Sequence, residues 1–396
     1  MTDNTATSRP GVVIAGGGVA ALECLMALRD LAGPDLPICL VAPDDAFRYR
    51  AMEVAEPFSL GHVESYALRE LAADFGAELV SAAVVKVRPD EHLVLCRDGT
   101  ELDYEAFVLA TGARPVAAFP RSVMLDPENR HEAMHGLLAD LEQGYGKRVA
   151  FVVPRGVTWT LPLYELAIMT AREVRDQGFD DVRFTLVTPE ARPLALFGPA
   201  AGATVGELMD AAGVGFAGST YAVPDGGALR LEPGGGRLEV DRVVALPTQR
   251  GPAMPGLPAD ALGFVPADQY GRVAGLDDVF AAGDVTTFPI KQGGLAAQQA
   301  DVVAGTVAAH FGGSRAPRPF KPVLRGLLFT GGDERFLRAG IGGGDGDGVA
   351  STSSLWWPPT KVAGQYLAPY LFARDEPAAD ERPPAGFTEV ALPVGR

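Results

Sequence analysis

A single carboxylate stands between an apolar run and a glycine-containing segment in residues 277–299, DDVFAAGDVTTFPIKQGGLAAQQ. The apolar run predicts a buried strand that ends at Gly283, and the Ala-rich run after Gly293-Gly294 predicts a helix. A carboxylate here can accept hydrogen bonds from the hydroxyl groups of a sugar or polyol, and Gly283 permits their close approach. The helix directs the positive end of its dipole toward the same place. Asp284 is therefore a candidate ligand-binding residue, and a plain turn or helix cap is the alternative.

A second candidate site is the glycine cluster in IAGGGVAALE. Gly16, Gly18 and Ala21 have the spacing G-x-G-x-x-A, between the β-branched run 11–15 and an apolar segment with helical spacing. The first glycine allows a tight turn, the second lets backbone approach a pyrophosphate, and the small residue lets helix pack on strand. The motif predicts a dinucleotide-binding βαβ unit without separating NAD from FAD. A glycine-rich turn without a ligand is the alternative.

The acidic residue that usually ends the second strand of such a unit is missing. The strand expected at 38–42 ends in Ala42-Pro43. Asp44 or Asp45 is a substitute for holding the ribose hydroxyls, and a pair of exposed loop acids is the alternative.

A third motif lies in AFVLATGARP, which predicts a buried strand ended by a glycine. At its end, Ala110, Thr111 and Gly112 let the chain cross close to a bound dinucleotide. The tripeptide alone carries little information. Its place after the glycine cluster, and after a hairpin turn at Asp98-Gly99, makes it informative.

Together, VVIAGGGVAALE, FVLATGARP and VFAAGDVTTFPIKQGGLAAQQAD resemble the two-dinucleotide-domain FAD-dependent pyridine nucleotide-disulfide oxidoreductase superfamily. Within it, the chain is most similar to the branch of sulfide:quinone oxidoreductases, flavocytochrome c sulfide dehydrogenases and type II NADH dehydrogenases. The resemblance covers residues 10–320. It implies noncovalent FAD, with the pyrophosphate at Gly16 and Gly18 and the ribityl chain at Asp284.

The resemblance also implies further cofactor contacts. The backbone near Lys291 and Gln292 would meet the pyrimidine edge of the flavin, and a strand at Val84 would contact the adenine. Arg50, in FRYRAMEVAEPF, would lie beside the flavin, with a surface arginine as the alternative. The predicted cofactor-binding residues are Gly16, Gly18, Ala21, Ala42, Pro43, Arg50, Val84, Ala110, Thr111, Gly112, Gly283, Asp284, Lys291 and Gln292.

The expected fold class is α/β. Two Rossmann-like dinucleotide-binding domains, the second inserted in the first, would be followed by a small C-terminal α+β region. We expect the FAD-binding domain at 8–118 and 265–318, the inserted domain at 119–264 and the C-terminal region at 319–396.

The inserted domain departs from the pattern of members that use NADH. In FVVPRGVTWTLPLYELA only Gly156 remains of a second glycine fingerprint, and Pro154 and Pro162 stiffen the loop. Backbone N–H groups therefore cannot cradle a second pyrophosphate in the usual way. We expect this domain to keep its fold and lose the standard NAD(P)H site. A variant loop that still binds NAD(P)H is the alternative.

The cysteines also depart from the pattern. Cys24, Cys39 and Cys96 form no CxxC, and none falls in the loop 154–165 or the tail, where sulfide-oxidising members carry their sulfur-handling pair. The sequence therefore argues against sulfide chemistry by that route and against disulfide reduction. No Cys/His cluster has the spacing of a metal site.

Catalytic residues are unknown from the sequence, with three weak candidates. Lys291 would place an ammonium where it favours the reduced, anionic flavin, or it is a solvated lysine at a helix start. Trp159 and Tyr164 are aromatic neighbours of the same region. The aromatic tail LWWPPTKVAGQYLAPYLF is either an interfacial wedge or, as we expect, core packing.

Composition narrows the partners. The chain of 396 residues has 34 Lys and Arg against 50 Asp and Glu, a net charge of −16. Such a chain disfavours nucleic-acid phosphates and anionic lipids. The polar N-terminus lacks a signal-peptide core and no long apolar run could span a membrane. We therefore expect a cytoplasmic protein, with peripheral membrane contact as an alternative. The oligomeric state is not indicated.

The function that fits best is an FAD-dependent oxidoreductase. It would pass electrons from an unidentified donor through noncovalent FAD to a quinone or another small acceptor, without redox-active cysteines. The alternatives are a non-enzymatic FAD-binding electron carrier or redox sensor, and a biosynthetic flavoenzyme that acts on a specific metabolite.

Overall fold

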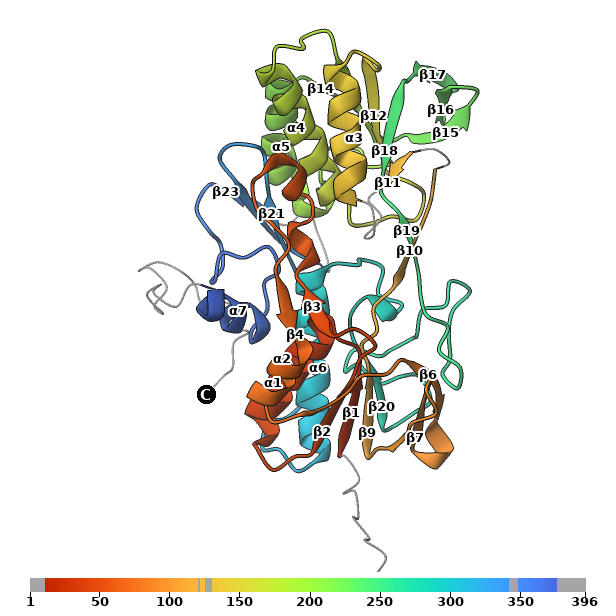
Figure 1. Ribbon diagram of the computed structural model, residues 1–396, viewed down its shortest axis with the longest axis vertical. Helices are drawn as coiled ribbons and strands as arrows, with labels where there is room; N and C mark the ends of the chain where they lie inside the picture. The colour runs from red at the N-terminus through yellow and green to blue at the C-terminus, as the bar shows by residue number, and fades with distance from the viewer. Residues whose placement is uncertain (1–10, 120–121, 125–129, 342–347, 376–396) are drawn as a thin grey trace, which may run out of the picture.

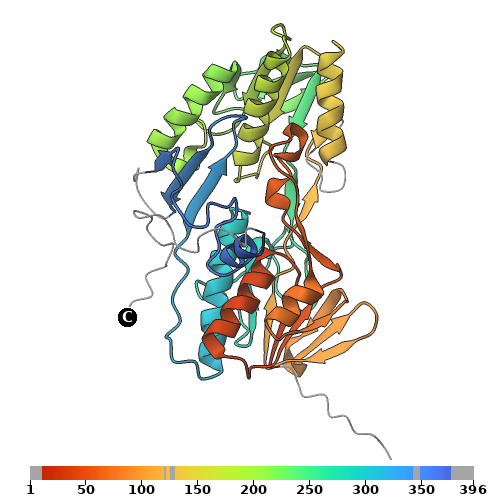
Figure 2. The same cartoon turned by 60° about the vertical axis from the view of Figure 1, so that its left-hand side comes forward.

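Two parallel sheets with helices beside them occupy the two ends of the molecule (Figure 1). The computed structural model describes residues 11–119, 122–124, 130–341 and 348–375. The C-terminal strands lie between these two α/β units, as the rotated view also shows (Figure 2).

The first unit is built on a five-stranded parallel sheet of order β20-β9-β1-β2-β5. Its central strands are apolar without interruption because both faces are covered. Val12 and Ile14 face the helices α1, α2 and α6, whereas Val13 and Ala15 face the antiparallel sheet β6-β7-β8. The elements are β1 (Val12–Ala15), α1 (Val19–Ala32), β2 (Ile38–Val41), α2 (Leu68–Asp74), β5 (Glu78–Val80), β6 (Val84–Arg88), β7 (Leu93–Cys96), β8 (Glu101–Asp103), β9 (Ala106–Leu109), β20 (Val279–Ala281) and α6 (Gly293–His310).

The second unit repeats this plan with a parallel sheet of order β11-β18-β12-β13-β14. Val149 and Phe151 of its central strand face the helices, and Ala150 and Val152 face a small antiparallel sheet. The elements are β11 (Val123–Met124), α3 (Arg130–Glu142), β12 (Arg148–Val152), α4 (Leu161–Asp176), β13 (Arg183–Val187), α5 (Gly198–Ala212), β14 (Val214–Ala217), β15 (Tyr221–Asp225), β16 (Ala228–Glu232), β17 (Gly236–Glu239) and β18 (Arg242–Ala245).

Two antiparallel strands connect the units: β10 (Arg114–Val116) leaves the first, and β19 (Thr248–Arg250) returns from the second. A second short ribbon, β3 (Ala46–Arg48) and β4 (Ser65–Ala67), lies beside α2.

The C-terminal part is an antiparallel sheet followed by a helix. Trp356 is fully buried with its ring centroid 5.1 Å from that of Phe336, and Trp357 packs on Phe372 at 5.1 Å. The expectation that the aromatic tail packs in the core is therefore confirmed for Trp356, whereas Trp357 and Phe372 are half-buried. The elements are β21 (Val323–Leu328), β22 (Arg335–Gly340), β23 (Val349–Ser351) and α7 (Leu367–Asp375).

Within the described residues, no helix has the length and hydropathy to cross a bilayer. The same residues contain no grouping of His, Cys, Asp and Glu side chains that could hold a metal ion.

Candidate functional site

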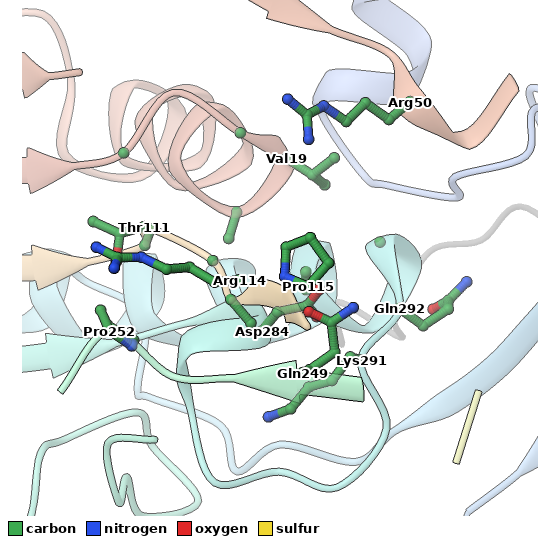
Figure 3. Close-up of a pocket in the computed structure, with 18 of the residues that line it drawn as sticks. Val19, Arg50, Thr111, Arg114, Pro115, Gln249, Pro252, Asp284, Lys291 and Gln292 are labelled. Carbon is green, nitrogen blue, oxygen red and sulfur yellow. The ribbon is translucent and has the colours of Figure 1, made fainter. Parts of the chain in front are cut away.

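A cavity of about 2010 Å³ opens at the carboxyl ends of the strands of the first sheet and extends to the second unit. Ligands bind at this edge in open α/β sheets. The loops that follow β1, β2, β9 and β20 all contribute to its wall, and Figure 3 shows several of these side chains. The predicted residues that line it are Gly16, Gly18, Pro43, Arg50, Val84, Ala110, Thr111, Gly112, Trp159, Asp284, Lys291 and Gln292.

The glycine cluster forms the start of α1. Gly16 has φ +135°, and a Cβ there would lie 2.3 Å from the carbonyl oxygen of Ala110, so only glycine lets this loop pass the end of β9. Gly18 is the N-cap residue, and a Cβ there would meet nothing within 4 Å. The first turn of α1 carries no acidic residue. Its unpaired N–H groups therefore face open space suited to an anion.

Three predicted cofactor-binding residues do not line the cavity. Ala21 is fully buried in α1, as a helix-packing residue must be, and Ala42 is fully buried after β2. Gly283 lies where a Cβ would come within 3.0 Å of the Ala20 side chain and 3.3 Å of the Ala296 side chain. These residues therefore position the wall without forming it.

Asp284 follows β20 in a short 3₁₀ turn, Gly283–Val285, and its carboxylate faces the cavity (Figure 3). Burial raises the pKa of Asp284 to about 6, against the opposing effects of the Lys291 ammonium and the backbone N–H of Gln292. The turn is held from behind, because the Gly283 N–H donates to Gln299 Oε1 at 2.8 Å. The carboxylate is thus fixed in place and poorly compensated, which suits it to accept hydrogen bonds from a ligand.

Lys291 and Gln292 precede α6. The Lys291 ammonium donates to the Thr286 carbonyl and lies 3.8 Å from the centroid of the Phe264 ring. Burial lowers the pKa of Lys291 to about 8, and Asp284 and Asp260 oppose this shift.

The side chain of Gln292 is occupied by the fold. Its Oε1 accepts from the Leu295 N–H at 2.7 Å, which caps α6, and its Nε2 donates to the Arg325 carbonyl at 3.1 Å. The Gln292 backbone is engaged as well, because its N–H meets the Asp284 carboxylate and its carbonyl accepts from Ala296 N–H at 2.9 Å.

The loop between β12 and α4 gives the second unit no glycine cradle. Its one glycine, Gly156, has φ +83°, and the neighbouring Arg155 is held by Glu232 at 2.9 Å and by the Tyr221 ring, whose centroid is 4.0 Å away. Trp159 lines the cavity, with its ring centroid 6.0 Å from that of Phe197.

Tyr164, predicted as an aromatic neighbour of the site, does not line the cavity. It is fully buried in α4 and outside the cavity wall, because its hydroxyl donates to Glu190 Oε2 at 2.8 Å. Glu190, just after β13, also accepts from the Thr188 hydroxyl and the Ala195 N–H, both at 3.0 Å. The acid at the place where a dinucleotide ribose is usually held is therefore engaged within the fold.

Sequence reasoning missed a buried ion pair on the cavity wall. Lys361 lines the cavity, pairs with the Glu165 carboxylate of α4, and donates to the Leu327 carbonyl at 2.8 Å. Burial lowers the pKa of Lys361 and raises that of Glu165, and their mutual attraction opposes both shifts. The available signals were an acid inside an apolar helix and the lone lysine of the aromatic tail.

The cysteines lie away from the site. All three fall within the described residues, are buried in the first unit and do not line the cavity. Burial raises the pKa of the Cys24 thiol and raises that of Cys39 to about 12. Neither is poised to form the thiolate that sulfur chemistry requires.

The fold is that of a two-dinucleotide-domain α/β protein. It has two Rossmann-like units, a glycine turn at the start of α1 and a carboxylate after β20. No model of a known protein family matches the chain. The chain is 27% identical over 194 residues to a sulfide-quinone reductase of Aquifex aeolicus (strain VF5), a match that spans 45% of this chain and 43% of that relative.

Solved structures show the same fold. The sulfide:quinone oxidoreductase of A. aeolicus superposes with a TM-score of 0.77 at 20% identity, covering 86% of both chains. A ferredoxin reductase of Rhodopseudomonas palustris superposes with a TM-score of 0.60 at 20% identity, covering 83% of this chain and 82% of that one. An NAD-dependent persulfide reductase of A. fulgidus superposes with a TM-score of 0.59 at 18% identity, covering 83% of this chain and 64% of that one. The expected fold class and resemblance are confirmed; the domain boundaries stay a prediction.

Proposed function

We propose that the protein is an FAD-dependent oxidoreductase that binds FAD noncovalently in this cavity and passes electrons to a quinone or another small acceptor. The observation that carries the proposal is the alignment of three features along one cavity wall: the open N-terminus of α1, the chain crossing at Thr111-Gly112, and Asp284. The similarity to a sulfide-quinone reductase supports the reaction class and the quinone.

The residues of the wall fit the cofactor from end to end. The N–H groups after Gly18 would hold the pyrophosphate, and Asp284 would accept hydrogen bonds from the ribityl hydroxyls. Pro43 and Val84 would border the adenosine, whereas Arg50 would lie toward the flavin. When bound, FAD supplies the electron transfer at its ring. The start of α6 and Lys291 would bring positive charge to the flavin edge where negative charge grows on reduction.

One part of the cavity wall suits a flat, apolar acceptor. Trp159, Leu161, Leu327 and Val362 line it, and Lys361 brings an ammonium to the same wall. Reduction of a quinone to a quinol takes up two electrons and two protons. We propose that Lys361 donates a proton at this wall and that Glu165 holds the lysine in its charged form.

A non-enzymatic electron carrier is the second candidate. Glu190 accepts a hydrogen bond from Tyr164, and Arg155 is paired with Glu232. These contacts favour the electron carrier, because they leave the second unit without the usual means of holding NAD(P)H. NAD(P)H is accordingly a doubtful donor. The proposed location is the cytoplasm, with contact to a membrane surface when the acceptor is lipid-soluble.

Anaerobic reduction tests this function. The FAD-loaded protein is mixed with NADH, NADPH or sulfide, the flavin absorbance is followed, and a soluble quinone is then added. Bleaching by one donor within seconds, followed by reoxidation and turnover with the quinone, is expected. A flavin that no donor reduces, or that reduces once and never turns over with an acceptor, would favour the carrier.

A further inference from the structure

Two arginines face each other on the strands that connect the units. In the β10-β19 ladder, Arg114 is the direct partner of Arg250, and Pro115 is the partner of Gln249. Both arginines are exposed to solvent and both line the cavity. Figure 3 draws Arg114, Pro115 and Gln249 among the residues of the cavity wall. The ladder therefore places the two arginines side by side on the wall of the cavity.

Like charges directly opposite on neighbouring strands destabilise a ladder. The chain has an excess of acids, 50 against 34 Lys and Arg, so a counter-charge would be easy to supply. Other arginines of the second unit have one: Arg148 lies 2.6 Å from Asp241, and Arg237 lies 2.7 Å from Asp225. In the described part of the chain, the guanidinium groups of Arg114 and Arg250 have neither a hydrogen bond nor an ion pair. Their repulsion is therefore uncompensated without a ligand.

Asp260, one of the acids that line the cavity, is committed elsewhere. Asp260 accepts the N–H groups of Leu262 and Phe264, both at 2.9 Å, and it faces Lys291. Of the other cations that line the cavity, Arg155 is already paired with Glu232. Arg48, Arg50 and Arg97 also line the cavity without an ion pair among the described residues. Arg114 and Arg250 differ from them because they are direct partners in one strand ladder.

The cavity has room for a ligand in addition to the cofactor. Its volume of about 2010 Å³ is larger than the roughly 300–1,000 Å³ of a typical small-molecule site. A second ligand that carries phosphate cannot use a glycine cradle in the second unit, where only Gly156 remains. Two adjacent arginines can bind the phosphate instead, since each guanidinium group can bind two of its oxygens.

We propose that Arg114 and Arg250 form a subsite for the phosphate or pyrophosphate group of a second ligand, separate from the place of the cofactor pyrophosphate at α1. This inference rests on the proposed function, because the second ligand is the partner of the bound flavin. The subsite gives the enzyme a preference for phosphorylated donors or acceptors without a second glycine fingerprint.

The test is pyrophosphate binding to the FAD-loaded protein, measured by calorimetry at low ionic strength. R114Q and R250Q are each expected to weaken pyrophosphate at least tenfold and to retain FAD. R69Q, which removes an exposed arginine of α2 outside the cavity, is the matched control and should bind as the wild type does. Each of the two cavity variants should also raise the thermal unfolding midpoint of the ligand-free protein.

Three results would overturn the subsite. The first is a wild-type protein that takes up FAD and does not bind pyrophosphate. The second is normal pyrophosphate binding by the R114Q and R250Q proteins. The third is loss of FAD from these variants, which would assign the arginine pair to the cofactor. Succinate serves as a carboxylate probe and is expected to bind at least tenfold more weakly than pyrophosphate. Equal binding would contradict the choice of phosphate. A wild-type protein that takes up no FAD would instead contradict the proposed function itself.

Discussion

The ammonium of Lys361, in the C-terminal segment, forms an ion pair with the carboxylate of Glu165, in α4, and both side chains are buried, with exposed fractions of 8% and 0%. The pair ties the C-terminal segment to the second unit on the wall of the cavity. Charges of this kind are retained for a structural or a chemical reason, because burying them is costly.

Removing one member of this pair should be more harmful than removing both. Lys361→Met leaves Glu165 as an uncompensated buried acid, and we expect it to lower the free energy of unfolding by about 3–5 kcal/mol. The double variant Lys361→Met/Glu165→Leu should regain most of this loss. Denaturant unfolding measures both. If the double variant recovers stability and also full quinone turnover, Lys361 has no role as a proton donor.

Asp284→Asn should weaken FAD and stabilise the protein that lacks it. Losing a charged acceptor costs about 1.5–3 kcal/mol of binding, which is tenfold or more in FAD affinity. The pKa of Asp284 is raised to about 6 from an ordinary value of 3.8. Its folding contribution is therefore full below pH 4 and is lost as the pH rises through 6, by on the order of 2–3 kcal/mol.

Titration with FAD and unfolding at pH 4 and pH 7 check this prediction. The ligand-free variant should be more stable than the wild type at pH 7, and the two should converge at pH 4. Asp277→Asn, an exposed acid of the same stretch outside the cavity, is the control. Unchanged FAD affinity in Asp284→Asn would remove Asp284 from the site.

Lys291→Gln should make the flavin harder to reduce. Loss of the ammonium removes positive charge from the edge where the reduced flavin is negative, and about 1.4 kcal/mol of lost preference corresponds to about 30 mV for a two-electron couple. Spectroelectrochemistry measures the potential, with Lys86→Gln on β6 as control. A potential that stays the same, or rises, contradicts this role.

The lowered pKa of Lys291 also predicts that the stability of the ligand-free protein depends on pH. Its pKa of about 8 in the folded protein lies below the ordinary 10.5. The unfolded chain therefore binds more protons between these values, and the contribution of Lys291 to stability rises with pH from 8 to 10.5. Lys291→Gln should flatten the stability curve in that window, as measured by unfolding at stepped pH.

Two glycines of one turn should respond differently to alanine. Gly16→Ala places a Cβ 2.3 Å from a backbone oxygen at a φ of +135°, so both folding and FAD binding should suffer. Gly18→Ala has free space and an ordinary φ of −97°, so the ligand-free protein should fold normally and lose FAD, because the new methyl occupies the pyrophosphate position. Gly18→Ala protein that binds FAD normally would argue against this placement.

The sequence was informative where backbone geometry decides the outcome. The glycines at 16, 112 and 283 each have a positive φ, which favours glycine, and Gly18 leaves open space at the start of α1. Such signals are local in the chain. The parallel sheets followed from continuous apolar runs for the same reason.

Contacts between distant segments were beyond the sequence. Glu165 and Lys361 are paired only because β21 brings the tail to α4, and Arg114 meets Arg250 only through the ladder of two connecting strands. Tyr164 was misread for a related reason, since its partner Glu190 follows β13, at a distance from α4 in the sequence, and their hydrogen bond holds the ring outside the cavity wall. Pairing of this kind depends on register, which local patterns do not encode.

The most direct test of the central claim is the flavin content of the purified protein. The account predicts a yellow protein that releases FAD on denaturation, one molecule per chain, and a Gly18→Ala variant that is folded and colourless. A wild-type protein that is colourless and takes up no FAD when the cofactor is supplied would contradict the account.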